Sequence, residues 1–179
     1  MKIPMNLPNR ITILRMLLIP VFLVLISFQG TVFRFIAAAV FILAAATDML
    51  DGMLARSRGE VTDFGKFIDP IADKLLVLMP MILLTASGDM WRVWAVMLMI
   101  AREIIVSGFR LVAAAKGIVI AAGWPGKIKT VVQMGAVVWL TLQIPLSVYA
   151  LWAAAVLSLY SGLLIIMKNR ELLGETTSA

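Results

Sequence analysis

Residues 48–73 read DMLDGMLARSRGEVTDFGKFIDPIAD, and this stretch places two pairs of aspartates in a very apolar chain. Asp48 and Asp51 are three residues apart, and Asp69 and Asp73 are four residues apart. On helices, the members of each pair lie on one face. Charged side chains are costly inside a membrane and usually mark a functional site. Four facing carboxylates repel one another unless cations lie among them, so the stretch predicts two helices that meet around a pair of divalent metal ions.

The composition indicates a membrane protein. Of the 179 residues 62% are hydrophobic, whereas soluble domains contain about 45–50%. The net charge of +6 would suggest nucleic acid in a soluble protein, but here the basic residues follow the positive-inside rule, so we expect no nucleic-acid partner. The chain has no cysteine and no histidine. Any metal must therefore have oxygen ligands, which favours Mg²⁺ or Mn²⁺ over zinc.

Six apolar stretches are long enough to cross a bilayer, for which a helix needs about 20 residues. They cover approximately residues 11–28, 32–54, 64–86, 90–115, 128–144 and 148–167. The expected fold is therefore all-α, with six transmembrane helices in one domain of residues 1–170.

Both ends of the chain are expected to lie outside these spans. Residues 1–9 contain Pro4 and Pro8, which disfavour a long helix, so we expect a short juxtamembrane segment along the membrane surface. Asn9 is the expected N-cap of the first span. The polar tail, residues 171–179, is expected to be disordered.

The basic residues also predict an orientation. Of the sixteen lysines and arginines, only Arg34 and Arg92 lie near one set of turns. The others lie near the opposite set or in the adjoining half-spans. That second side, with both termini and the four aspartates, is therefore expected to face the cytoplasm of a bacterial cell membrane.

Residues around the aspartates suit a diphosphate. Gly52 has no side chain, so a bulky group can approach the backbone there. One turn later Arg56 supplies a planar donor for phosphate oxygens. Gly65 allows the two helices to pack closely. Thr62 or Asp63 can cap the second helix, whose N-terminal N–H groups favour anions. Together these features predict a dinuclear metal site that binds a diphosphate at the membrane surface.

The motif Asp-x2-Asp-Gly-x2-Ala-Arg-x8-Gly-x3-Asp-x3-Asp resembles the signature of the CDP-alcohol phosphatidyltransferases, with all eight fixed positions present between Asp48 and Asp73. The length and the expected spans are also similar to that family. The resemblance implies that an alcohol hydroxyl attacks the β-phosphorus of a CDP-linked lipid and that CMP leaves. It also implies a homodimer.

The resemblance assigns roles by position. Asp48, Asp51 and Asp69 would ligate the metal ions, and Asp73 would share a metal and act as the base that takes the hydroxyl proton. The CDP moiety would be contacted by Gly52, Arg56 and Thr62, with Asn9 and Thr12 as further nucleotide contacts.

Three other stretches, residues 6–12, 100–110 and 126–130, resemble the bacterial branch of the family that joins glycerol 3-phosphate to CDP-diacylglycerol. That reaction gives phosphatidylglycerophosphate and CMP. An acceptor with its own phosphate needs positive charge, and the candidates at the cytoplasmic mouth are Arg102, Arg110, Lys127 and Lys129. Two alternatives stay open: the two lysines are topology signals, or Arg102 forms a structural network with Glu103.

Rival functions remain at this point. The nearest is the same chemistry with inositol phosphate, serine or a second phospholipid such as phosphatidylglycerol as the acceptor. A prenyltransferase also uses aspartate motifs for a diphosphate, but it would need more spans. An ion-binding transporter would typically show repeated halves, and the sequence contains no such repeat.

Overall fold

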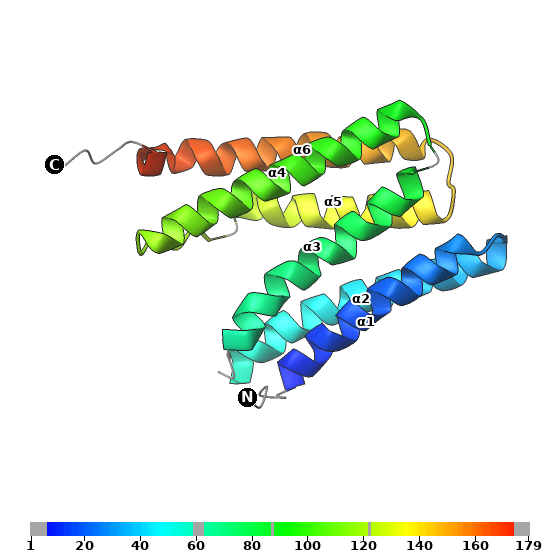
Figure 1. Cartoon of the computed structure of the whole chain (residues 1–179), viewed down its shortest axis with the longest axis horizontal. Coiled ribbons are helices and arrows are strands. Elements are labelled where there is room, and N and C mark those ends of the chain that lie inside the picture. The colour runs from blue at the N-terminus through cyan, green and yellow to red at the C-terminus, as the bar shows by residue number, and fades with distance from the viewer. Residues whose placement is uncertain (1–6, 59–62, 87, 122, 174–179) are drawn as a thin grey trace.

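The computed structural model describes residues 7–58, 63–86, 88–121 and 123–173. Most of these residues belong to six long helices (Figure 1). The helices are α1 (Leu7–Ser27), α2 (Thr31–Arg58), α3 (Asp63–Thr85), α4 (Met90–Ala115), α5 (Trp124–Thr141) and α6 (Ser147–Lys168), followed by a short 3-10 helix, η1 (Arg170–Leu173). The described residues contain no strand. The expected all-α class is therefore confirmed.

Glycine and proline mark several of the helix ends. Gly30, between α1 and α2, has a φ of 130°, and Gly117, after α4, has a φ of 75°. Glycine adopts such angles without a steric penalty. Pro125 lies in the first turn of α5, where its missing N–H group costs nothing. The apolar pattern predicted a start near residue 128. Because proline is favoured at a helix start, α5 begins earlier, at Trp124.

The prediction for the start of the chain is wrong in one respect. Asn9 was expected to cap the first helix, but α1 already begins at Leu7 and Asn9 lies inside it. Pro8 does not prevent this, because the first helical turn needs no backbone N–H donor. The side chain of Asn9 is buried. Residues 1–6 lie outside the described part of the chain.

The tail is partly ordered, although disorder was expected from Glu171 onward. Glu171 lies in η1, which continues the chain beyond α6 to Leu173. The last described residues therefore form a short 3-10 turn, and residues 174–179 lie outside the description.

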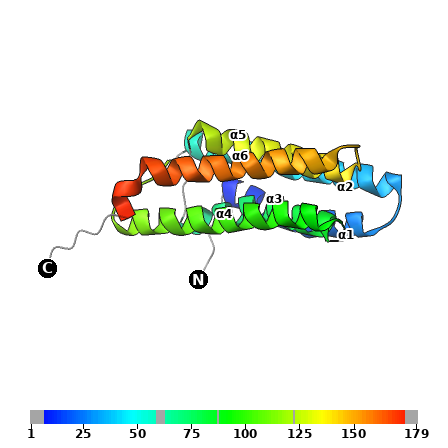
Figure 2. The same cartoon turned by 90° about the horizontal axis from the view of Figure 1, so that it is seen from above.

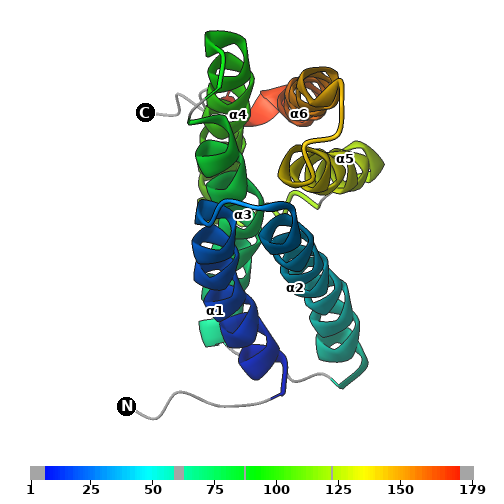
Figure 3. The same ribbon diagram turned by 90° about the vertical axis from the view of Figure 1, so that its right-hand side faces the viewer.

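The helices form two layers. In Figures 2 and 3, α1, α3 and α4 lie in one layer, and α2, α5 and α6 lie in the other. Within the first layer α3 packs against both α1 and α4. Across the layers α1 packs against α2, and α4 packs against α6. The helix α3 thus joins the two halves of the bundle, and this matters because it carries two of the four aspartates.

Small residues allow the helices to approach closely. Ala37, Ala72, Ala95 and Ala154 are almost completely buried where helices meet, as is common in helix packing within membranes. Larger side chains fill the remaining space, and the rings of Phe22 and Phe41 lie 5.8 Å apart. The core therefore fixes α1, α2 and α3 relative to one another.

The outside of the bundle is strongly apolar. Leu17, Phe35 and Val131 are all more than half exposed, which suits contact with lipid chains. By length and apolar composition, two of the described helical segments could cross a membrane, Asn9–Ser27 and Ser147–Lys168, and a shorter apolar stretch covers Thr31–Thr47.

Candidate active site

The two aspartate pairs lie at one end of the bundle. Asp48 and Asp51 belong to the last part of α2, and Asp69 and Asp73 belong to the first half of α3. The first residues of α1 lie at the same end (Figure 1). Side-chain positions are not described for the α2 residues of the motif, Asp48, Asp51, Gly52 and Arg56. The predicted cap and nucleotide contact Thr62 lies outside the described residues.

Thr12 joins the N-terminal helix to the motif. Its hydroxyl group donates a hydrogen bond of 2.8 Å to the Oδ1 atom of Asp69. Thr12 is 1% exposed, and its hydrogen bond to the half-buried Asp69 is partly buried. The expected nucleotide contact of α1 and the expected metal ligand of α3 are thus neighbours.

Asp73 forms an ion pair with a residue that the sequence analysis missed. The Nη1 atom of Arg15 lies 2.5 Å from Oδ1 of Asp73. The arginine is completely buried, whereas half of the aspartate side-chain surface is exposed. One oxygen of Asp73 is therefore oriented by a buried cation while the carboxylate still opens to the outside.

The sequence contained a signal for Arg15. Asn9, Thr12 and Arg15 recur every three residues and are the most buried polar side chains of α1. Polar residues at this spacing share a helix face. A basic residue on that face, inside an apolar segment, is a candidate partner for an aspartate. Thr12 and Arg15 of this face both contact aspartates of α3.

The chemistry of these residues fits a divalent cation. The carboxylates of the motif are oxygen donors, which Mg²⁺ and Mn²⁺ prefer. Of the four aspartates, only Asp69 and Asp73 have described side chains. Among the described side chains, no three acidic groups form a cluster. The exposed carboxylate of Asp73 leaves access for a metal ion and for a substrate hydroxyl group.

A second polar group ties α4 to α5 and α6. Glu103 accepts hydrogen bonds from Lys129 and, at 2.8 Å, from Nη1 of Arg102. The Nε atom of Arg102 donates to the carbonyl oxygen of Ser158, and Nη2 donates to the hydroxyl group of Ser161. All three ionisable side chains are at most 12% exposed. These contacts favour the structural interpretation of Arg102 that the sequence left open.

Arg110 and Lys127 differ from these two buried cations. The Nε atom of Arg110 is buried and has no hydrogen-bond partner among the described atoms. Lys127 is exposed, and its ammonium group lies 5.3 Å from the ring centre of Trp124. Of the four basic candidates, these two keep more of their hydrogen-bonding capacity.

Lys74 links the aspartate helix to α4. It follows Asp73 directly, and its ammonium group donates a 2.6 Å hydrogen bond to the hydroxyl group of Ser107. That hydroxyl group donates in turn to the backbone carbonyl of Glu103. Lys74, the neighbour of Asp73 in the sequence, is therefore tied through Ser107 to the backbone of α4 at Glu103.

Comparison with known proteins identifies the family of the chain. A family model described as CDP-alcohol phosphatidyltransferase matches residues 5–160. The chain is 40% identical to the CDP-diacylglycerol–glycerol-3-phosphate 3-phosphatidyltransferase of Bacillus subtilis (strain 168), over 94% of this chain and 97% of that protein. It is 41% identical to the protein of the same name from Escherichia coli (strain K12), over 87% of this chain and 90% of that protein. The chain therefore belongs to the CDP-alcohol phosphatidyltransferase family.

Proposed function

We propose that this membrane enzyme transfers the phosphatidyl group of CDP-diacylglycerol to glycerol 3-phosphate, giving phosphatidylglycerophosphate and CMP. The observation that carries the proposal is the complete aspartate motif in a chain that is similar, over nearly its whole length, to relatives named for this reaction. The reaction is a step of phospholipid biosynthesis.

Four carboxylates would hold two divalent cations, Mg²⁺ or Mn²⁺: Asp48, Asp51, Asp69 and Asp73. When bound, such ions neutralise the diphosphate and stabilise the charge that develops during phosphoryl displacement. The hydrogen bond from Thr12 would hold the Asp69 carboxylate in position for this task.

Asp73 is the proposed general base. Its carboxylate would take the proton from a hydroxyl group of glycerol 3-phosphate, and the hydroxyl oxygen would form a bond to the β-phosphorus of CDP-diacylglycerol. The bond between that phosphorus and the bridging oxygen would break, and CMP would leave with the electron pair. Arg15 would act as a positioning residue, because it fixes one oxygen of Asp73 through a buried ion pair.

The CDP moiety would lie over the end of α2 and the start of α1. Gly52 would leave room for the diphosphate, and Arg56 would bind its oxygens with two parallel N–H groups. The further nucleotide contacts that we propose are Asn9, Thr12 and Thr62. Asn9 and Thr12 belong to the first turns of α1, and Thr12 directly contacts the proposed metal ligand Asp69.

The acceptor phosphate would be bound by basic residues of α4 and α5. We propose Arg110 and Lys127 as direct ligands, because both keep hydrogen-bonding capacity. Arg102 and Lys129 are bound to Glu103; they would contribute positive charge and hold the surrounding helices in place.

The proposed topology has six membrane spans, with the active site and both termini in the cytoplasm. The uneven distribution of the basic residues supports this orientation. The lipid chains of CDP-diacylglycerol would stay in the bilayer while its headgroup reacts at the surface. A homodimer is proposed from the family alone.

The decisive experiment is a transferase assay. Purified protein would receive CDP-diacylglycerol, Mg²⁺ and radiolabelled glycerol 3-phosphate, and both labelled lipid and released CMP would be measured. We expect labelled phosphatidylglycerophosphate and CMP in equal amounts. Inositol phosphate, serine and phosphatidylglycerol serve as competing acceptors. Turnover with one of these and none with glycerol 3-phosphate would contradict the proposed acceptor.

A further inference from the structure

We propose that the end of the bundle opposite the aspartates binds an anionic phospholipid from the leaflet that surrounds it. A cavity of 640 Å³ opens there, among the last residues of α1, α3 and α5 and the first residues of α2, α4 and α6. Thr85, at this end of α3, is twelve residues beyond Asp73, which corresponds to about 18 Å along a helix. The cavity is therefore separate from the proposed active site.

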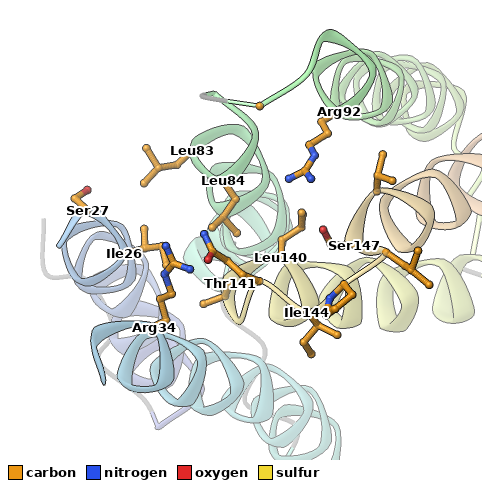
Figure 4. A pocket seen from close by; sticks show the side chains of 15 residues that line it. Ile26, Ser27, Arg34, Leu83, Leu84, Arg92, Leu140, Thr141, Ile144 and Ser147 are labelled. Atoms are coloured by element: carbon orange, nitrogen blue, oxygen red, sulfur yellow. The ribbon is translucent and has the colours of Figure 1, made fainter. Parts of the chain in front are cut away.

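Two arginines give the cavity a strong positive charge. Arg34 of α2 and Arg92 of α4 both line it, and Figure 4 shows their guanidinium groups reaching into it from different sides. Neither arginine forms an ion pair with any side chain that the structure describes, and the Nε atom of Arg92 is buried without a hydrogen-bond partner among the described atoms. Arginine stays protonated in proteins, so the pair needs an anion, and its planar groups suit phosphate oxygens.

The backbone near Arg92 leaves room for this orientation. A Cβ atom at Gly88 would lie 2.9 Å from Cδ of Arg92 and 3.3 Å from the carbonyl oxygen of Thr85. A larger residue at this position would force the arginine stem to move. Gly88 therefore allows the side chain of Arg92 to cross the turn between α3 and α4 and enter the cavity.

The opposite wall of the cavity contains an uncommon backbone conformation. Gln143 and Leu146, in the turn between α5 and α6, line the cavity and have φ values of 52° and 63°. Residues other than glycine rarely adopt this region, and such strained residues are frequent at ligand sites. This turn therefore forms one wall of the cavity in a backbone conformation that costs some free energy.

An apolar groove beside the cavity identifies the ligand as a lipid. This groove, of 520 Å³, lies between α1 and α3 and is lined by side chains such as Val24, Met79 and Ile82, which are exposed on the outer face. Ser27 and Leu83 line both the groove and the arginine cavity. A free phosphate ion would make no contact with an apolar groove. A phospholipid can bind the arginines through its phosphate and can lay an acyl chain along the groove.

The test is a binding measurement on the purified full-length protein in detergent. Short-chain phosphatidylglycerol, short-chain phosphatidylcholine and inorganic phosphate are titrated separately by calorimetry. We expect phosphatidylglycerol to bind at least about tenfold more tightly than the other two, since charged hydrogen bonds and chain burial both contribute. In an Arg34→Gln/Arg92→Gln variant its affinity should fall by about tenfold or more. The matched control, Lys168→Gln/Arg170→Gln, removes equal charge from exposed residues at the other end and should bind phosphatidylglycerol like the wild type.

Two further variants serve as controls. The first shows whether a loss of affinity comes from misfolding, and the second distinguishes a lipid from a soluble anion. Arg34→Lys/Arg92→Lys keeps the charge and should retain most of the affinity for phosphatidylglycerol. Ile82→Trp fills the groove at a residue that does not line the arginine cavity, so it should weaken phosphatidylglycerol binding and leave phosphate binding unchanged. Equal phosphatidylglycerol affinity in the wild type and the glutamine variant would overturn the proposal. Inorganic phosphate binding as tightly as phosphatidylglycerol would also overturn it, in favour of a soluble anion.

Discussion

Thr12 and Arg15 lie about one turn apart on α1, and each contacts a different aspartate of α3. Asp69 receives a hydrogen bond from a neutral hydroxyl group, which leaves its full charge for a cation. Asp73 is paired with a buried guanidinium group, and half of its side-chain surface is exposed. The different surroundings of the two aspartates therefore suit different roles. Asp69 suits metal binding alone, whereas Asp73 also suits contact with a substrate proton.

Asp73→Asn tests the proposed base. The amide keeps the size of the side chain but cannot take a proton, so turnover should fall by at least about 10²-fold. CMP release is measured with purified protein, and gel filtration checks that the variant is folded. A variant that kept full transferase activity would show that Asp73 is not the base.

Arg15→Met and Arg15→Lys test the positioning role. The methionine variant should lower kcat by about ten- to a hundredfold, because the carboxylate of Asp73 loses its fixed orientation. The KM for glycerol 3-phosphate should change much less, since Arg15 is completely buried. Lysine restores a positive charge and should recover part of kcat. A purely structural residue would instead lower the amount of folded protein and leave kcat unchanged.

Removal of divalent cations tests the metal assignment. Chelation with EDTA should abolish CMP release, because the four carboxylates would then repel one another and the diphosphate. Added Mg²⁺ or Mn²⁺ should restore activity, as expected for oxygen ligands. Asp69→Asn should need a higher metal concentration for half-maximal activity. Full activity in EDTA would contradict a metal-dependent reaction.

The sequence predicted the roles of individual residues mainly where they belong to a recognisable motif. The spacing of the aspartates, with Gly52 and Arg56, was sufficient to recognise the family that the comparisons confirm. Arg15 and Asp73 are 58 positions apart; the polar spacing of α1 marks Arg15 as a candidate partner for an aspartate, but it does not identify which aspartate. Their contact depends on how α1 packs against α3, which only the three-dimensional arrangement provides.

At the scale of the helices, Glu103 is the point where α4 meets α5 and α6. It stands between two cations, Arg102 and Lys129, and the arginine continues to Ser158 and Ser161 of α6. Buried charges are tolerated when they are paired in this way. The group fixes the positions of the helices that carry the proposed acceptor ligands.

Glu103→Gln tests this link between helices. The substitution leaves two buried cations close together without a charged partner, so the protein should lose about 3–5 kcal/mol of stability. A lower Tm in detergent is the measurement. Glu171→Gln, an exposed site in η1, is the control and should leave the Tm unchanged. An unaltered Tm for Glu103→Gln would mean that the group does not hold α4 to its neighbours.

The apolar pattern predicted the six helices because their composition contrasts sharply with that of the turns. Most observed limits lie within a few residues of the expected ones. The predicted starts of α1 and α5 were both too late, and both errors involve a proline. Pro8 was interpreted as a break, and Pro125 was not considered. Proline is compatible with a first turn, so the apolar pattern gives the middle of a helix more reliably than its ends.

At the scale of the whole molecule, the two layers place different chemistry at their two ends. One end holds the aspartates beside Thr12 and Arg15, and the other holds Arg34 and Arg92 around a cavity. Because α3 runs between these ends and contacts α1, α4 and α5, it fixes the distance between them. In the proposed topology, the reacting headgroup would lie at one membrane surface and the bound lipid at the other.

The proposed orientation can be tested directly, because the chain contains no cysteine. A single thiol is introduced by Asp89→Cys, in the exposed turn before α4, or by Val119→Cys, in the exposed turn after it. In bacterial cells whose outer surface is accessible, a membrane-impermeant maleimide should label the first variant in intact cells. It should label the second only after the membrane is opened, because the positive-inside rule places that turn in the cytoplasm. Labelling in the reverse order would invert the topology and place the aspartates on the outer surface. Labelling of both thiols in intact cells, with a cytoplasmic marker protein still protected, would contradict a bundle that crosses the membrane along α4.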